Sequence, residues 1–272
     1  MTEARPLSIG NYQRRDTCRG CLGDRLVTFL DYGNVPLAGD FIKPEQVGTE
    51  SIYPMDLSFC EDCSLVQITN VVDADELFTD YRYLSSVTST LMGHFREYAQ
   101  VLKSRLSSKE NPLVVEFGCN DGVLLTPLGR LGVKAVGVDA AENVVELARG
   151  KGLDVRHGYF GGDLAGQLRQ AYGPADIITA SNVFAHIDDL DNVMRGVDGL
   201  LATDGTFCVE VHYVLDLVET VQFETVYHEH LCYYSLKALG SLYKRFGLAI
   251  VDAERLPMHG GAIRVFAQRE PA

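Results

Sequence analysis

The sequence has little positive charge. Its 272 residues contain 24 Lys and Arg against 37 Asp and Glu, which gives a formal net charge of −13. Proteins that bind nucleic acid contact phosphates with clustered basic residues, and no such cluster stands out here. The composition therefore argues against a nucleic-acid partner. It stays compatible with a small phosphorylated substrate, which needs only a local pocket.

The sequence also lacks long apolar runs. None approaches the roughly 20 residues that span a bilayer, and the amino terminus has no apolar signal core. We therefore expect a cytoplasmic protein without a membrane partner. A hydrophobic fraction of 46% with 22% charged residues is ordinary for a globular enzyme, and the length suits one large domain or a medium one with an appendage.

Four of the seven cysteines form two Cys-x-x-Cys pairs, Cys18/Cys21 and Cys60/Cys63. In a cytosolic chain, such pairs favour metal binding or thiol chemistry over disulfide bonds. Two pairs complete a tetrahedral shell of four thiolates that suits zinc and leaves no position for water, so the metal would be structural. A redox pair is the alternative, but neither pair is at a strand-to-helix junction. Short strands are expected between the pairs, at 28–30 and 57–59.

The segment 114–122 predicts a short buried strand, a glycine turn and the start of a helix. Gly118 and Gly122 let the backbone approach a ligand, and the first amides of the helix supply hydrogen-bond donors. The dinucleotide fingerprint Gly-x-Gly-x-x-Gly is absent. The acid two residues before the first glycine, Glu116, instead makes this stretch resemble class I S-adenosylmethionine (SAM) methyltransferases.

A second carboxylate, Asp139, ends the strand expected at 133–139. An acid at that position can accept hydrogen bonds from both ribose hydroxyls of an adenosine. Alternatively, Asp139 only caps the helix expected to start near Ala141. The two roles are compatible.

Strands and helices continue to alternate along the chain, which predicts a parallel sheet with right-handed crossovers. Three further strands are expected at 153–160, 175–184 and 206–211. Loops at the carboxyl ends of such strands build the site, so Asn182, Phe184 and His186 are expected at the cleft. Ser235 is expected to cap a helix that Gly247 ends. Two closing strands, 248–252 and 262–267, are joined by a turn at 259–261.

A helix is expected between the cysteine-rich region and the glycine turn, because Leu91, Phe95, Tyr98 and Leu102 fall on one helical face. The segment before it, 80–86, is both aromatic and polar. Its tyrosines either close over a ligand or pack the joint between domains.

The segment 227–234 carries seven ionisable or phenolic side chains in eight positions, which suits a site better than a core. In an extended conformation Tyr227 and Glu229 would share one face, and His228 and His230 the other. General acid–base catalysis is the favoured interpretation. A second metal site built on the two histidines is the alternative, and it lacks an evident third ligand.

Taken together, these residues resemble the zinc-containing, SAM-dependent sugar C-methyltransferases of TDP-deoxysugar biosynthesis. Members share the four-cysteine module, the Glu-x-Gly-x-Asn-x-Gly turn and a Tyr-His-Glu-His segment. They also share a Tyr-x-Tyr-x-Ser-Ser segment, here 81–86, and a His-Gly-Gly-x-x-Arg turn, here 259–264. The resemblance spans nearly the whole chain.

The resemblance implies an α/β fold: a class I SAM methyltransferase Rossmann-like sheet with a small N-terminal four-cysteine zinc module. The expected divisions are a zinc module at 1–72, a helical connector at 73–110 and the SAM-binding domain at 111–272. SAM is the implied methyl donor and zinc the implied structural metal. The expected SAM-binding residues are Glu116, Gly118, Asn120, Gly122, Asp139 and Asn182.

The implied reaction is methylation of a carbon in a nucleotide-linked keto-deoxysugar. A base removes the hydrogen beside the keto group, and the enolate attacks the sulfonium methyl. His230 is the implied base, with Glu229 orienting it. Tyr227 or His186 is the implied neighbour of the enolate, and Tyr81 is a further implied site residue.

Two other functions remain open: an O- or N-methyltransferase acting on a small acceptor, and a SAM- and zinc-binding module that works only with a partner chain. Family members continue past the His-Gly-Gly turn into a further α/β domain, whereas this sequence stops at Ala272. We therefore expect a short relative or a truncated chain. What the family implies about SAM binding should then apply to this sequence better than what it implies about the substrate. The sequence fixes neither the acceptor nor the oligomeric state.

Overall fold

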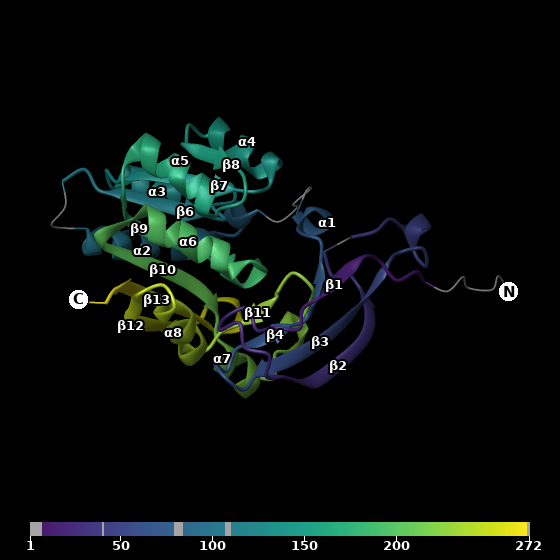
Figure 1. The fold of residues 1–272 in the computed structure, drawn as a ribbon. Helices are drawn as coiled ribbons and strands as arrows, with labels where there is room; N and C mark the ends of the chain where they lie inside the picture. The colour runs from purple at the N-terminus through teal and green to yellow at the C-terminus, as the bar shows by residue number, and fades with distance from the viewer. Residues whose placement is uncertain (1–6, 40, 79–83, 107–109, 271–272) are drawn as a thin grey trace.

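The computed structural model describes residues 7–39, 41–78, 84–106 and 110–270. They form a large α/β unit and a smaller β-rich unit that lie side by side (Figure 1). In the described part of the chain, no helix combines the length and the apolar character needed to cross a bilayer.

The large unit is built on a seven-stranded sheet in the order β12-β13-β10-β9-β6-β7-β8. The strands are β6 (Leu113–Phe117), β7 (Lys134–Asp139), β8 (Val155–His157), β9 (Ala175–Ser181), β10 (Leu201–His212), β12 (Leu248–Leu256) and β13 (Ala262–Arg269). The strands from β6 to β10 are parallel, as predicted, and β13 runs antiparallel to both β10 and β12. The alternation of strands and helices therefore predicted the central sheet correctly.

Several strand boundaries differ from the sequence prediction, and β12 continues to Leu256 instead of ending at residue 252. The third strand covers only 155–157, and the fourth ends at Ser181 because the chain turns there into a 3-10 helix. β10 begins at Leu201, directly after α6 and before the start of the strand predicted at 206–211.

Helices cover both faces of this sheet. The α-helices of the described residues are α1 (Ala74–Phe78), α2 (Ser89–Arg105), α3 (Leu125–Arg130), α4 (Glu142–Gly150), α5 (Gly162–Tyr172), α6 (Leu190–Leu200), α7 (Val214–Glu219) and α8 (Leu236–Lys244), of which α7 packs against the smaller unit instead. Short 3-10 helices are η1 (Pro44–Gln46), η2 (Ser85–Val87), η3 (Phe184–His186), η4 (Phe223–Thr225) and η5 (Met258–Gly260). On one face α5, α6 and α8 pack against the sheet, and on the other α2 and α3 do (Figure 1).

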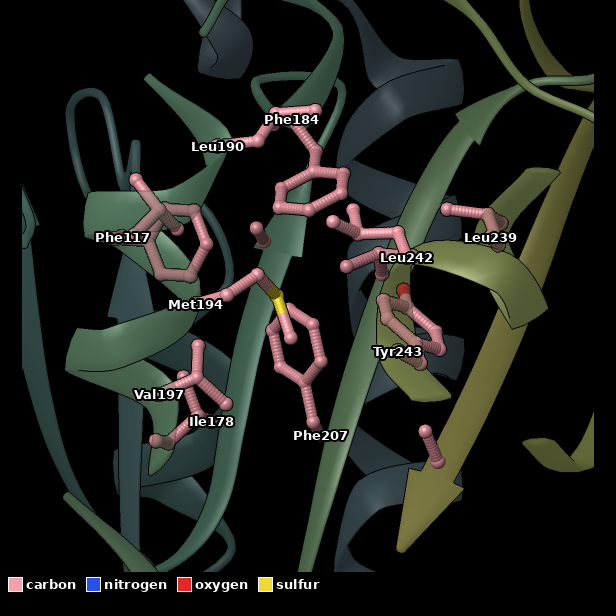
Figure 2. Close-up of a cluster of buried hydrophobic side chains, with 14 of the residues drawn as sticks. Phe117, Ile178, Phe184, Leu190, Met194, Val197, Phe207, Leu239, Leu242 and Tyr243 are labelled. Carbon is pink, nitrogen blue, oxygen red and sulfur yellow. The ribbon is translucent and has the colours of Figure 1, made fainter. Parts of the chain in front are cut away.

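The larger core cluster lies between the sheet and α6 and α8, where Phe117, Met194, Phe207 and Tyr243 meet (Figure 2). Burying this apolar surface fixes the sheet whose carboxyl edge carries the site. On the opposite face, α2 buries the predicted residues Leu91, Phe95, Tyr98 and Leu102. The predicted cap of α8 is also confirmed, because the Ser235 hydroxyl accepts a hydrogen bond from the Ala238 amide.

The smaller unit contains a four-stranded antiparallel sheet in the order β11-β4-β3-β2. Its strands are β2 (Leu26–Pro36), β3 (Ile52–Cys60), β4 (Val66–Ile68) and β11 (Cys232–Tyr233); β1 (Tyr12–Arg14) pairs separately with β5 (Asn70–Val72). The strands predicted at 28–30 and 57–59 fall within β2 and β3. The pairing of β11 with β4 brings the segment around His230 against this unit (Figure 1).

Candidate active site

One large cavity, of about 940 Å³, opens at the carboxyl ends of the parallel strands. Its lining includes residues that follow β6, β7, β8 and β9, and it extends to the end of β10 and to the segments 222–230 and 259–260. This is the edge at which parallel α/β sheets bind ligands. The cavity brings together the glycine turn and the polar segment before α8.

The turn after β6 has the close backbone approach that its glycines predict. Gly118 has φ of 67°, and a Cβ atom there would lie 2.6 Å from the Val183 side chain, so only glycine fits. Next to it, the backbone amide of Asn120 donates to Asp139 Oδ2 at 2.8 Å, and the Ala141 amide donates to Asp139 Oδ1 at 3.0 Å. Asp139 therefore binds both the glycine turn and the start of α4.

Four of the six predicted SAM-binding residues line the cavity: Gly118, Asn120, Asp139 and Asn182. The other two, Glu116 and Gly122, lie behind the turn. Glu116 is buried, burial raises the pKa of its carboxyl group, and its Oε2 has no hydrogen-bond partner in the described structure. Gly122 faces Leu153, whose side chain leaves no room for a Cβ atom.

Tyr227 and His230 face the cavity together and are hydrogen-bonded to each other. Nδ1 of His230 is 2.8 Å from the carbonyl oxygen of Thr225, which can only accept, so Nδ1 carries the proton. Nε2 is then the basic nitrogen, and the Tyr227 hydroxyl donates to it at 2.7 Å. The ring is thus held in the tautomer that a general base requires.

The extended conformation expected for this segment is wrong. The His230 amide donates to the Tyr227 carbonyl at 2.9 Å, so the chain makes a turn that places these two residues on the same side. His228 is buried with its ring against Tyr53, and the Glu229 carboxylate lies beside Gly39 in the smaller unit. Neither of them lines the cavity. The role predicted for Glu229 stays a prediction, and the structure places its carboxylate away from the cavity.

Three further histidines surround His230. Ring centroids are 5.0 Å apart for His186 and His230, 4.8 Å for His212 and His230, and 6.0 Å for His212 and His259. Burial is the main cause that lowers the pKa of His186 to about 4 and the pKa values of His212 and His230 to about 3. These imidazoles are therefore neutral at neutral pH. Within the described residues, only the four cysteines are spaced to hold a metal ion.

His212 was missed by the sequence analysis. The signal that would have found it is a polar residue at the last position of a parallel strand, β10. His259 had been placed only in a turn; the structure brings that turn to the rim of the same cavity.

The expected placement of Phe184 at the cleft is wrong. The 3-10 helix η3 turns its ring into the core, where it is fully buried and packs on Phe207 and Tyr234 (Figure 2). Its neighbours Asn182 and His186 do line the cavity. Tyr81 lies outside the described residues. From the same predicted segment, Ser85 lines the cavity, and its amide donates to Asn120 Oδ1.

The two Cys-x-x-Cys pairs meet at one point of the smaller unit. The four Sγ atoms lie within 4.8 Å of one another, with Cys18 and Cys63 at 3.5 Å and Cys21 and Cys60 at 3.6 Å. Sulfurs about 2.3 Å from a tetrahedral zinc would be about 3.8 Å apart, so the cluster fits this metal. Burial raises the pKa of Cys21 to about 11, and a bound cation would offset that penalty for the thiolate.

Two parts of the chain match two different families of known proteins. Residues 92–253 match a family described as "Methyltransferase domain", and residues 18–78 match one described as "Putative zinc binding domain". The first match covers more than half of the chain. The chain therefore belongs to the SAM-dependent methyltransferase family, and its Rossmann-like sheet with an N-terminal four-cysteine cluster confirms the predicted fold class.

Among curated relatives, the chain is 36% identical over 253 residues to the C-methyltransferase NovU of Streptomyces niveus. The match covers 93% of this chain and 60% of NovU. The chain is also 25% identical over 182 residues to the ubiquinone biosynthesis O-methyltransferase of Bartonella quintana. This match covers 64% of the chain and 62% of that protein. The chain thus spans about three fifths of the length of these relatives.

Among solved structures, the magnesium protoporphyrin IX methyltransferase ChlM of Synechocystis PCC 6803, with bound SAH, superposes with a TM-score of 0.52 and 17% identity. The superposition covers 68% of this chain and 89% of that one. At this identity the match supports the fold alone.

Proposed function

We propose that the protein methylates a carbon atom of an activated keto sugar, with SAM as the methyl donor. The observation that carries this proposal is the Tyr227–His230 pair, a neutral base that shares one cavity with the glycine turn after β6. Carbon methylation needs such a base, because the attacking carbon must first lose a proton. The relationship to a C-methyltransferase, NovU, supports the same reaction.

In this proposal SAM lies over Gly118 and Asn120, with its ribose on Asp139. A carboxylate offers about four acceptor positions. The amides of Asn120 and Ala141 donate to Asp139 and fix its orientation, and the acceptor positions that face the cavity are proposed to receive the ribose hydroxyls. Asn182 lines the same side of the cavity.

The base in the proposed reaction is Nε2 of His230. It removes the proton from the carbon beside the keto group, either directly after the Tyr227 hydroxyl moves away or through that hydroxyl as a relay. The enolate carbon then attacks the methyl carbon of SAM, the sulfur–methyl bond breaks, and its electron pair stays on sulfur to leave S-adenosylhomocysteine. The acceptor and the methyl donor are held in one cavity, which supplies proximity.

The acceptor is proposed to be a nucleotide-linked keto-deoxysugar. The described residues that line the cavity include no Lys or Arg, so its walls offer no cationic partner for a diphosphate. We therefore place the sugar ring inside the cavity and the diphosphate outside it. The four-cysteine cluster is proposed to hold a structural zinc.

A panel of nucleotide-linked keto sugars, incubated with the protein and SAM, tests the proposal by mass spectrometry. We expect one added methyl group on carbon, and deuterium uptake at the same carbon when S-adenosylhomocysteine and deuterated water replace SAM and water. The relationship to an O-methyltransferase makes an oxygen acceptor the second candidate. A methyl group on oxygen or nitrogen, without deuterium uptake, would favour that candidate. SAM binding without transfer to any acceptor would favour a module that needs a partner chain.

A further inference from the structure

His212 occupies a distinctive position in the cavity. It is the last residue of β10, only 8% exposed, and its ring lies between those of His230 and His259. The strand that carries it is held between β9 and β13, so its backbone position is rigid. A side chain on such a strand end is fixed well enough to meet a reacting group.

The ring nitrogens of His212 have no hydrogen-bond partner among the residues that the structure describes. The contrast with His230 is direct, since Nδ1 of that residue binds the Thr225 carbonyl and Nε2 binds the Tyr227 hydroxyl. Ring nitrogens that face a cavity and bind no described residue can take a hydrogen-bond partner from a ligand. The cavity is where that partner would lie.

The absence of cationic side chains from the described lining of the cavity favours a role for His212 as a hydrogen-bond donor. An enolate places negative charge on oxygen, and the described lining residues include no Lys or Arg to meet it. Burial, followed by the neighbouring His230 and His259, lowers the pKa of His212 to about 3. A neutral imidazole keeps one N–H, which can donate to an oxyanion without changing protonation state.

We propose that His212 contacts the acceptor and donates a hydrogen bond to the carbonyl oxygen on which the enolate charge develops. This inference rests on the proposed function. The α-proton goes to His230, the C–H pair forms the carbon–carbon double bond, and the carbonyl pair moves to the oxygen held by His212. When the carbon attacks the methyl group of SAM, the carbonyl reforms and the sulfur–methyl bond breaks. His212 gains and loses no proton.

Two substitutions separate a donor role from a packing role. His212→Gln keeps an N–H donor and loses the ring, whereas His212→Phe keeps an aromatic ring and loses the donor. Loss of one oxyanion donor lowers a rate by roughly 10²–10³-fold, which we expect for His212→Phe both in methyl transfer and in deuterium exchange with S-adenosylhomocysteine. His212→Gln should retain more of both rates, and SAM affinity should change in neither. His228→Phe is the control for replacing a buried histidine outside the cavity and should stay close to the wild-type rate.

Thermal unfolding and SAM binding establish whether each variant is folded. If one of the two variants does not fold, the other still tests the proposal. If His212→Phe exchanges the α-hydrogen at the wild-type rate, or retains more activity than His212→Gln, the His212 proposal is overturned while the proposed function stands. If the wild-type protein methylates oxygen or nitrogen without exchange, both are overturned.

Discussion

Arg19 lies between Cys18 and Cys21 of the four-cysteine cluster, and its Nε donates a hydrogen bond to the Asp188 carboxylate at 2.8 Å. Its guanidinium is buried and also donates from Nη1 to the carbonyl oxygen of Ile68 at 2.6 Å. Asp188 lines the cavity. The Arg19 side chain therefore joins the four-cysteine cluster to one wall of the candidate active site.

Removing the charge of Asp188 should destabilise the protein. Asp188→Asn keeps the shape of the side chain but leaves the buried Arg19 guanidinium and the half-buried Arg15 without their shared carboxylate, which we expect to cost roughly 1–3 kcal/mol of unfolding free energy. Urea unfolding measures this. The control is Asp252→Asn, which breaks the ion pair with Arg105 at the surface and should cost less than about 1 kcal/mol. Equal effects would mean that the Asp188 carboxylate contributes no more than an ion pair at the surface.

The four-cysteine cluster should bind about one zinc per chain. Cys60→Ser removes one thiolate, so it should lose the metal, and a chelator should lower the melting temperature of the wild-type protein. Elemental analysis and thermal unfolding measure the two effects. Cys119→Ala, at a buried cysteine outside the cluster, should retain the zinc. A folded, metal-free preparation with freely titratable cluster thiols would contradict this prediction.

Asp139→Ala should weaken SAM binding by roughly 1.5–3 kcal/mol, because it removes a charged acceptor of hydrogen bonds from the ribose. Calorimetric titration gives the dissociation constant. Asp139 also binds the amides of Asn120 and Ala141, so thermal unfolding must establish that the variant is folded. Asp154→Ala, which removes an exposed carboxylate from the same domain, is the control. An unchanged dissociation constant for Asp139→Ala would place the ribose elsewhere.

His230→Ala should abolish methyl transfer and α-hydrogen exchange, and it should leave SAM binding intact. The reason is that Nε2 of His230 is the basic nitrogen held toward the cavity. His228→Ala serves as the control, because that ring packs on Tyr53 outside the cavity. Exchange that persists in His230→Ala at the wild-type rate would assign the base to another residue, and Tyr227 would be tested next.

The buried histidines should make the protein less stable in mild acid. The folded-state pKa of His212, about 3, lies below its unfolded value of about 6.5, so between these values only the unfolded chain binds the proton. Its contribution to stability is complete above about pH 6.5 and falls with pH by up to about 1.4 kcal/mol per pH unit. His212→Gln should show a shallower loss between pH 6 and pH 4 in urea unfolding.

The comparison between wild type and variant isolates this histidine. The raised pKa of Glu116 acts in the opposite direction, since the folded state then binds a proton more readily, but it is common to both proteins. Parallel stability curves for the two proteins would show that His212 is protonated equally in the folded and unfolded states.

Local patterns predicted the parts of the site that depend on adjacent residues. The glycine turn, Asp139 at the tip of β7 and the paired cysteines follow from short spacings, and the structure places each where those spacings predict. Periodicity identified the buried face of α2 for the same reason.

Features that depend on tertiary contacts could not be predicted. The turn at Tyr227–His230 forms where β11 joins β4, and this distant pairing overrides the extended conformation expected from local sequence. The cluster of His186, His212 and His259 around His230 is assembled from four segments far apart in the chain. The Phe184 ring points into the core, because it packs there between α6 and α8.

The pairing of β11 with β4 also constrains how the chain folds. The residues of β4, 66–68, leave the ribosome long before Cys232 and Tyr233, so one edge of the smaller sheet stays open until those two residues have been made. Closing it requires a contact between distant parts of the sequence, which is slow, and an open strand edge in the meantime favours pairing with other chains. The smaller unit therefore depends on residues far along the chain from its other strands to complete its sheet.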